Sequence, residues 1–375
     1  MCGALIRSGT VGLVAILTLV FAAGAAHADF LILENGRTFR GELTSYPDGS
    51  VTTSESEYRY DKEKVARSST EETVDEVIEN WGGEIGECDT ACTRKACLSL
   101  AKFCVVQERY KAASRFFARW GKQKGWKVYS SKFYFILSDT KVKRVKEIGA
   151  RLDAIMRFYQ KEFGAERAPK QDFVVRFFKS ENQFDAFARE AGMAGAGAFY
   201  HPATRELVLW DMSLTNKNLT FEAVYHEANH QYVGGYYLDH EPGHCWLSEG
   251  LATYYETAKY RSKRIVAHGG KARCYLDDLR HGDRTGKLTP LAEFLSMGRE
   301  EFYCGGGQES VNYAQAWGVV YFLKNTKDKR CREFLGRYLE TLKETKDDAK
   351  ALAAALDGVA CAELEEAFGE FRKRL

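Results

Sequence analysis

The 375-residue sequence lacks an excess of charge of either sign. Its 54 lysines and arginines and its 52 aspartates and glutamates leave a formal net charge of +2. Nucleic acids and anionic membrane surfaces attract proteins with clustered positive charge, so the charge balance supports neither class of partner. With 45% hydrophobic and 28% charged residues, the composition is that of an ordinary globular protein. Partners must therefore be inferred from motifs.

After residue 28 the sequence has no apolar stretch that is long enough to cross a bilayer. The first 28 residues differ, because Arg7 precedes an apolar run at 11–23 and an Ala-x-Ala signal at 26–28. This arrangement is typical of a signal peptide. An uncleaved membrane anchor is the alternative, and the small residues near the end of the run favour cleavage. We therefore predict a signal peptide at 1–28, export after cleavage near Ala28, and no integral membrane contact thereafter.

The sequence contains no Cys-x-x-Cys pair, so a thiol redox protein has little support. One of the ten cysteines is Cys2, which leaves nine in the mature chain, and export permits disulfides. Because nine is odd, at least one thiol is free or pairs between chains. The cysteines between Cys88 and Cys104 have spacings that fit no zinc site well, and we expect disulfides or buried thiols there. Their connectivity stays open.

Turn signals and periodicity divide the mature chain into three parts. Residues 29–68 alternate short apolar runs with turn signals at 35–36 and 47–49, which predicts a small β module. Residues 69–125 have apolar positions at helical spacing and resemble one tetratricopeptide-like hairpin. One copy is too few for a repeat array, so we prefer a helical spacer. Residues 126–375 form the third part.

The third part begins with strand patterns and becomes mainly helical. Strands are predicted at 128–137, 173–178 and 206–210, and a long amphipathic helix is predicted at 142–163. Strands that precede helices indicate an α+β domain.

An H-E-x-x-H motif comprises His226, Glu227 and His230. On a helix, positions i and i+4 lie on one face, so both imidazoles can reach one metal ion. Glu227 lies on the adjoining side, where it can act on a water molecule at the metal. We predict that Thr220 caps the start of this helix and that the glycines at 234–235 end it.

A second H-E-x-x-H match lies between His240 and His244. Its middle residues are Pro242 and Gly243, which disfavour a helix because proline lacks a backbone donor and glycine has a high backbone entropy. This segment is predicted to be a loop, so its two histidines would not share a helical face. The first motif is therefore the predicted metal site.

A third acidic residue follows the first motif. Eighteen residues separate His230 from Glu249, which lies in the pattern W-L-x-E-G-x-A-x-Y-x-E at residues 246–256. Across residues 220–256 the sequence resembles the gluzincin zinc metallopeptidases, aminopeptidase N most of all and thermolysin more distantly. The wider layout is similar to exported bacterial proteins of the peptidase MA type. The resemblance implies a thermolysin-like catalytic domain at 126–375.

The resemblance also implies the roles of the site residues. His226, His230 and Glu249 would bind Zn²⁺, and Glu227 would be the general base. Two imidazoles and one carboxylate leave an open coordination position, as peptide hydrolysis by zinc requires. Enzymes similar to aminopeptidase N place an oxyanion-binding tyrosine on a later helix, which points to Tyr313, although an ordinary core tyrosine is an equal alternative. His201 is a weaker candidate, since a turn histidine is the simpler interpretation.

The expected substrate is a peptide or protein, with no nucleic acid partner. Aminopeptidase N binds the free amine of its substrate through a G-x-M-E-N motif, whereas the nearest segment here, residues 195–200, contains no acid. We therefore expect an endopeptidase. The alternative function is an inactive or weakly active gluzincin scaffold that binds partners in the cell envelope.

Overall fold

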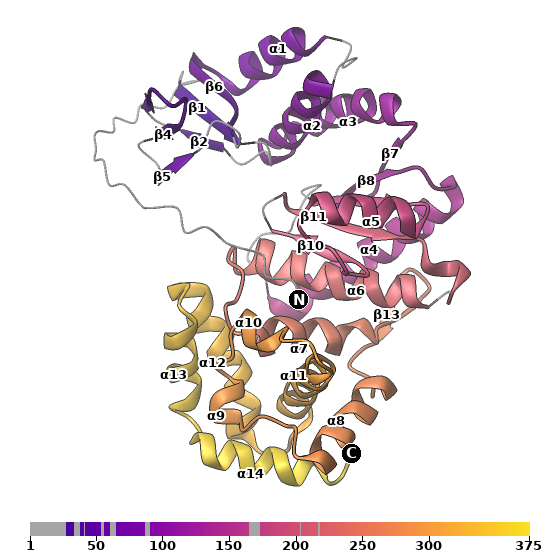
Figure 1. The fold of residues 1–375 in the computed structure, drawn as a ribbon, viewed down its shortest axis with the longest axis vertical. Coiled ribbons are helices and arrows are strands. Elements are labelled where there is room, and N and C mark those ends of the chain that lie inside the picture. Colours follow the sequence, from indigo (N-terminus) through magenta and orange to yellow (C-terminus); the bar gives the residue numbers. More distant parts are fainter. Residues whose placement is uncertain are drawn as a thin grey trace. The chain divides into compact units, whose positions relative to one another are not determined.

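The computed structural model of the chain describes residues 28–33, 38–40, 42–53, 56–60, 65–86, 91–164, 173–202, 204–216 and 218–375. The predicted signal peptide lies outside these residues, apart from Ala28. No helix in the described part of the chain is long and apolar enough to cross a membrane. The chain divides into two compact units, Met1–Val128 and Tyr129–Leu375 (Figure 1).

The first unit begins with six short strands. They are β1 (Ala28–Leu33), β2 (Thr38–Arg40), β3 (Leu43–Ser45), β4 (Val51–Thr53), β5 (Ser56–Tyr60) and β6 (Val65–Glu72). They form two antiparallel sheets with the orders β2-β1-β6 and β3-β4-β5. We predicted that the β module would end at residue 68, but β6 continues to Glu72. The pairing of Glu72 with Ala28 at the end of β1 explains this extension.

One of the two predicted turns in this module lies in the described residues. The N–H of Gly49 donates to the carbonyl of Tyr46, and Gly49 has a φ of 80°, as a tight turn at 47–49 requires. This turn is confirmed. The predicted turn at 35–36 lies outside the described residues.

Three helices complete the first unit. They are α1 (Val74–Ile85), α2 (Ala91–Val106) and α3 (Tyr110–Lys124). Thr73 and Glu76 form a capping box at the start of α1. The rings of Phe30 on β1 and Trp81 on α1 both contact Phe103 on α2, at centroid distances of 6.2 and 6.5 Å. The strands and helices of this unit therefore share a core.

The cysteines with described side chains are free thiols. The four buried thiols are those of Cys97, Cys104, Cys245 and Cys331. The three that are partly or fully exposed are those of Cys274, Cys304 and Cys361. Cys97 and Cys104 lie seven residues apart on α2, which is about 10 Å along the helix axis and too far for a disulfide. Of the two predicted alternatives, buried thiols apply to this pair. The side chains of Cys88 and Cys92 are outside the described part.

The second unit contains a five-stranded sheet with the order β10-β11-β9-β8-β7. Its strands are β7 (Lys127–Ser130), β8 (Tyr134–Ser138), β9 (Phe173–Phe178), β10 (Phe199–His201) and β11 (Glu206–Trp210). β8, β9 and β11 are parallel, and β10 is an antiparallel edge strand. The predicted strands at 173–178 and 206–210 are confirmed.

The predicted strand at 128–137 is divided into β7 and β8. Between them, the carboxylate of Asp153 accepts hydrogen bonds from the hydroxyl of Ser131 and from the backbone N–H groups of Lys132 and Phe133. A side chain from a helix thus binds the backbone groups that a continuous strand would use in its ladder.

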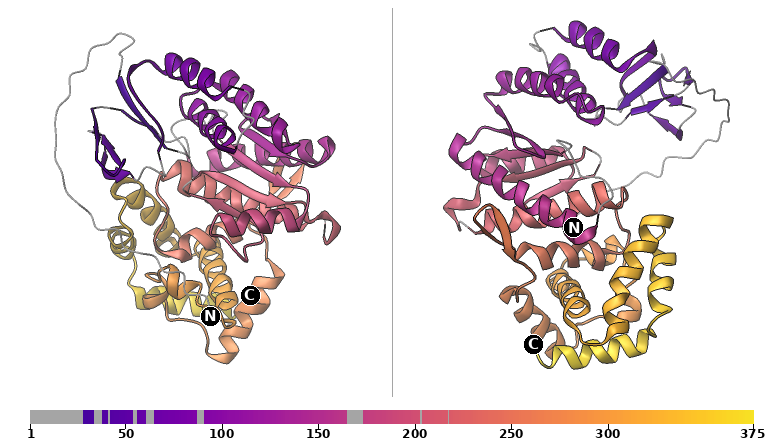
Figure 2. Two further views of the ribbon diagram at one scale, coloured as in Figure 1. Left: turned by 45° about the horizontal axis from the view of Figure 1, so that its top comes forward. Right: turned by 180° about the vertical axis from the view of Figure 1, so that it is seen from behind.

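Helices cover both faces of this sheet (Figures 1 and 2). They are α4 (Val142–Phe163), which matches the predicted helix, α5 (Glu181–Glu190) and α6 (Leu219–Tyr232). Ile136, Val175 and Leu207 are in register on one face and belong to the same buried core as Val224 of α6. On the opposite face, the ring of Phe178 packs against Phe184 of α5 at 6.2 Å. The sheet therefore provides a firm support for α6.

The C-terminal part of this unit is mainly helical, which confirms a mixed α+β architecture. Its elements are a 3₁₀ turn at Met212–Leu214, a π-helical segment at Val233–Tyr237, α7 (Cys245–Glu256), β12 (Lys259–Arg261), β13 (Arg264–Ala267), α8 (Arg273–Thr285), α9 (Leu291–Phe294), α10 (Arg299–Phe302), α11 (Gln308–Asn325), α12 (Lys329–Thr345), α13 (Asp348–Leu356) and α14 (Cys361–Arg372). α7 crosses α11 closely, because a Cβ on Gly250 would lie 2.6 Å from the carbonyl oxygen of Ala316.

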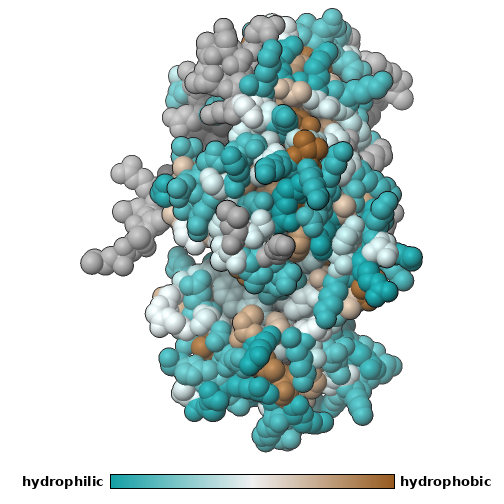
Figure 3. Space-filling model, turned by 90° about the vertical axis from the view of Figure 1, so that its right-hand side faces the viewer, coloured by the Kyte–Doolittle hydropathy of each residue, from teal (hydrophilic) through white to brown (hydrophobic). Residues whose placement is uncertain are grey.

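The surface drawn in Figure 3 is mostly hydrophilic, with small separate apolar areas. Four large hydrophobic side chains are exposed among the described residues: Val106, Val142, Leu219 and Val266. Single exposed apolar residues of this kind are normal in globular proteins.

Candidate metal centre

His226, Glu227 and His230 lie on α6, as the motif predicts. The details of the helix ends differ from the prediction. Asn218, not Thr220, is the N-cap residue, and Thr220 is buried in the first turn. At the other end, regular α-helical hydrogen bonding stops at Tyr232 and a π-helical segment continues to Tyr237. The α-helix thus ends directly before the predicted stop at 234–235, but the two glycines lie inside the π-helical continuation.

The glycines have a different role from the one predicted. A side chain on Gly235 would collide with the hydroxyl of Tyr200 on β10, and a side chain on Gly234 would collide with the carboxylate of Glu241. The two glycines thus allow close approach of other residues to this part of the helix.

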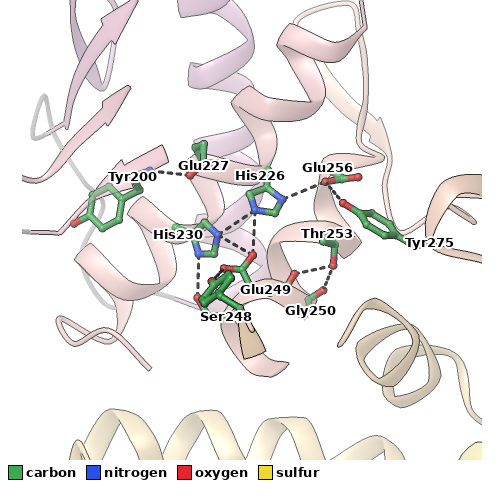
Figure 4. Close-up of polar contacts among 11 residues, drawn as sticks. Tyr200, His226, Glu227, His230, Ser248, Glu249, Gly250, Thr253, Glu256 and Tyr275 are labelled. Carbon is green, nitrogen blue, oxygen red and sulfur yellow. Dashed lines mark hydrogen bonds and ion pairs between the residues drawn. The ribbon is translucent and has the colours of Figure 1, made fainter. Parts of the chain in front are cut away.

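α7 brings Glu249 opposite the two histidines (Figure 4). The Nε2 atoms of His226 and His230 are 3.2 Å apart. The Oε2 atom of Glu249 lies 3.3 Å from Nε2 of His226 and 3.5 Å from Nε2 of His230. Three ligand-type atoms from two helices therefore form a nearly equilateral triangle.

The triangle has the dimensions of a zinc site. Ligand atoms about 2.0–2.1 Å from a tetrahedral zinc ion are separated from one another by about 3.3–3.4 Å. The three measured edges lie close to this value. Oε2 of Glu249 is also buried without a hydrogen-bond partner in the described structure. A buried carboxylate oxygen without a donor is costly, and a cation at the centre of the triangle would offset that cost.

The outer atoms of both imidazoles have polar partners that fix their orientation. Nδ1 of His226 lies 3.1 Å from Oε2 of Glu256, which also accepts a hydrogen bond from Tyr275. Nδ1 of His230 lies 3.0 Å from Oγ of Ser248. When each Nδ1 carries the proton and donates outward, each Nε2 presents its lone pair to the triangle. Such outer partners are typical of histidine metal ligands.

Glu249 is oriented in the same way. The hydroxyl of Tyr303 donates a hydrogen bond to Oε1 of Glu249, which leaves Oε2 directed at the histidines. All three ligand-type side chains therefore have one atom held from outside and one atom in the triangle.

The electrostatics of the site favour a cation. Burial opposes a charged imidazole at His226, but the carboxylates of Glu249 and Glu256 outweigh it and raise its pKa well above the ordinary value. Burial also opposes ionisation of Glu249, but the two imidazoles hold its pKa well below the ordinary value. Glu249 is therefore a carboxylate at neutral pH, and its charge is available to positive partners.

Glu227 lies beside the triangle and is 8% exposed. Its Oε2 atom accepts a hydrogen bond of 2.8 Å from the backbone N–H of Tyr200 on the edge strand β10. Burial raises the pKa of Glu227 above that of an ordinary glutamate. A carboxylate with a raised pKa accepts protons more readily, which suits a general base.

Tyr313 on α11 lies beside the triangle and next to Tyr303, with 6.1 Å between the ring centroids. Burial and the charge of Glu249 raise the pKa of Tyr313, so its hydroxyl stays protonated and can donate a hydrogen bond. His201 is on β10, where its Nδ1 accepts from the backbone N–H of Thr204. That contact is the one expected of a turn histidine.

The second H-E-x-x-H segment is not helical, as predicted. Nδ1 of His244 lies 2.7 Å from the hydroxyl of Tyr338, and Nε2 of His240 lies 3.8 Å from Asp348. Asp348 also accepts hydrogen bonds from the backbone N–H groups of Gly243 and His244. These two histidines bind α12 and α13 and do not join the metal triangle.

Three residues at the site were not identified from the sequence: Ser248, Glu256 and Tyr275. Glu256 had a detectable signal, since it lies seven residues after Glu249 and two helical turns place it on the same face. Ser248 directly precedes Glu249. Tyr275 reaches the site through tertiary packing and had no signal in the local pattern.

Residues 220–345 match the model of a family described as a protein of unknown function, DUF1570. The matched region includes α6, α7 and Tyr313. A search of curated proteins finds no match to this chain. This part of the chain is thus similar to a family whose description gives no activity.

Proposed function

We propose that this protein is an exported zinc-dependent peptidase of the gluzincin type, with a thermolysin-like catalytic domain at residues 126–375. The observation that carries the proposal is the triangle of His226, His230 and Glu249, whose edges of 3.2–3.5 Å fit tetrahedral zinc. A structural interpretation would have to explain why two half-buried histidines and a buried glutamate converge, with one carboxylate oxygen that lacks a donor. The fit of Glu227 beside them supports hydrolysis over simple metal storage.

The three residues of the triangle would hold the ion, and Glu256, Ser248 and Tyr303 would keep them in position. When bound, zinc lowers the pKa of a water molecule and polarises a carbonyl group. The protein supplies the remaining chemistry. Oε1 or Oε2 of Glu227 takes a proton from the attacking water and returns it to the nitrogen of the leaving amine. The hydrogen bond from Tyr200 holds this carboxylate in place.

The hydroxyl of Tyr313 is the proposed donor to the oxyanion. It is protonated at neutral pH because burial and the charge of Glu249 raise its pKa. A fixed donor of this kind stabilises the negative charge that develops on the substrate oxygen.

Cleavage within chains is the expected mode, since residues 195–200 contain no acid to bind a terminal amine. The position of β10 at the edge of the sheet supports this mode, because an edge strand can bind an extended peptide through backbone hydrogen bonds.

The test is hydrolysis of an unfolded protein by the mature chain, with and without added zinc, alongside Glu227→Gln. We expect the wild type to cut only when zinc is present and Glu227→Gln to bind zinc and lose about 10²–10⁴-fold in rate. The amide is nearly isosteric with the carboxylate but cannot accept the proton.

A pair of peptides tests the mode of cleavage. An N-acetylated peptide and its free-amine twin should be cut at the same internal bond at similar rates. If only the free-amine peptide is cut, and one N-terminal residue at a time, the protein is an aminopeptidase and the proposed endopeptidase activity is wrong. No turnover by a zinc-loaded wild type on any substrate would favour a binding role for this scaffold in the cell envelope.

A further inference from the structure

The second H-E-x-x-H segment contains a glutamate whose position its loop structure does not explain. His240 and His244 contact Asp348 and Tyr338, whereas the carboxylate of Glu241 lies against Gly234 in the π-helical segment after α6. A backbone hydrogen bond of 2.9 Å from the N–H of His240 to the carbonyl of Gly234 holds the loop against the end of this helix.

The contact with Gly234 places Glu241 against the π-helical segment that follows α6. A Cβ on Gly234 would lie 2.5 Å from Oε1 and 3.0 Å from Oε2 of Glu241, so the missing side chain is what allows the carboxylate to lie there. The charges of His230 and Glu249 act on this carboxylate, which places it near the proposed metal ligands.

Glu241 is half-buried, and its carboxylate makes no hydrogen bond or ion pair with any residue that the structure describes. Burial raises its pKa, and it senses the charges of His230 and Arg299 without contacting either. By contrast, Glu249 and Glu256 have hydrogen-bond donors. A partly desolvated carboxylate without a partner is unfavourable unless a ligand provides one.

The charges around the metal centre indicate the sign of that ligand. Glu227, Glu249 and Glu256 already bring three carboxylates to a centre that would hold a divalent ion with two neutral imidazoles, so Glu241 adds a further negative charge. The charge of Arg299 acts on Glu241, but Arg299 makes no ion pair with it among the described contacts. Tyr200 lies close to both Glu227 and Glu241, because its backbone N–H donates to Glu227 and the charge of Glu241 acts on its hydroxyl. A peptide that lies along β10 to reach Glu227 would therefore pass close to Glu241.

We propose that Glu241 is a specificity residue that binds a cationic group of the substrate, an ammonium or guanidinium, next to the scissile bond. This inference rests on the proposed peptidase function. The cation can come from a lysine or arginine side chain within a chain or from a free N-terminal amine. A charge-assisted contact of this kind is expected to strengthen binding by about 10–100-fold.

The experiment measures peptide binding, with Glu227→Gln as a zinc-loaded background that does not cut. One set of N-acetylated peptides carries a single lysine moved through a neutral sequence, and its matched set carries glutamine at the same positions. A third set has no lysine and a free N-terminal amine. Fluorescence anisotropy gives the Kd of each peptide for Glu227→Gln, for Glu227→Gln with Glu241→Gln, and for Glu227→Gln with Glu300→Gln.

Glu300→Gln is the matched control, since it removes the same charge from an exposed position on α10. We expect lysine at one position, or the free amine, to bind about 10–100-fold more tightly than its neutral counterpart. Glu241→Gln should abolish that preference, and Glu300→Gln should keep it. Zinc content should be equal in all three proteins.

Two results separate the inference from the proposed function. In the first, the wild type cuts the peptides, but the lysine, free-amine and glutamine peptides all bind with the same Kd. The assignment of Glu241 is then wrong, whereas the proposed peptidase function stands. The same holds if Glu241→Gln leaves a cationic preference unchanged. If no peptide binds to the zinc-loaded protein, both the function and the inference fail.

Discussion

The chain contains the same five-residue motif twice, and the two copies differ in almost every structural respect. His226 and His230 lie one turn apart on α6 and direct their Nε2 atoms at each other across 3.2 Å. His240 and His244 lie in a loop with Pro242 and Gly243 between them, and each contacts a different side chain. Two histidines of such a motif can reach one metal ion only when the backbone places them on one face.

The outer partners of the histidines extend the comparison. The first copy has Glu256 and Ser248 behind its imidazoles and Tyr303 behind the third ligand. The second copy has Asp348 and Tyr338, which belong to the packing of α12 and α13. Each copy therefore has a carboxylate and a tyrosine, and matched substitutions can separate catalysis from stability.

The largest contrast is expected between two tyrosines. Tyr313→Phe should retain zinc and lower the rate of peptide hydrolysis by about 10²–10³-fold, because it removes the proposed donor to the oxyanion. Tyr338→Phe removes a hydroxyl that contacts His244 and Asp348, and the rate should stay near that of the wild type. Steady-state kinetics of both variants provide the measurement. Equal rates for the two would make Tyr313 a packing residue and direct attention to Tyr303.

A smaller contrast is expected between two carboxylates. Glu256→Gln should weaken zinc affinity by about 10–100-fold, because it replaces the charged acceptor that orients His226 with a neutral amide. Asp348→Asn should leave zinc affinity unchanged and lower the free energy of unfolding by about 1–2 kcal/mol, since Asp348 accepts two backbone hydrogen bonds. Competition with a chelator gives the affinity, and urea denaturation gives the stability. The same zinc affinity in both variants would remove Glu256 from the site.

The smallest effect concerns the pH dependence of stability. Burial lowers the pKa of His244, so the folded protein binds its proton less readily than the unfolded chain does. Its contribution to the free energy of unfolding is therefore full above about pH 6.5 and decreases as the pH falls below that value. His244→Gln should lose less stability than the wild type between pH 7.5 and pH 5.5. Thermal denaturation of the two proteins at both pH values checks this, and identical losses would contradict it.

Local patterns in the sequence predicted the elements that carry the site. The periodicity of residues 142–163 and the apolar run at 173–178 predicted α4 and β9 with their observed bounds. The spacing of His226 and His230 and the proline at 242 distinguished the two copies of the motif correctly. These features depend on residues that are close in the sequence.

The features that could not be predicted depend on distant contacts. Asp153 divides β7 from β8 from a position about twenty residues later in the chain, and Tyr303, directly after α10, binds Glu249. The π-helical segment after Tyr232 contains two glycines that Tyr200 and Glu241 approach closely. None of these contacts leaves a periodic pattern in the sequence.

The most direct test of the central claim is the zinc content of the purified wild type, His226→Ala and His240→Ala by elemental analysis. The two variants remove the same side chain from equivalent positions of the two motifs. We predict one zinc ion per chain in the wild type and in His240→Ala, and little or none in His226→Ala. Full zinc occupancy in His226→Ala, or loss of zinc in His240→Ala alone, would contradict the assignment of the metal centre to α6 and α7.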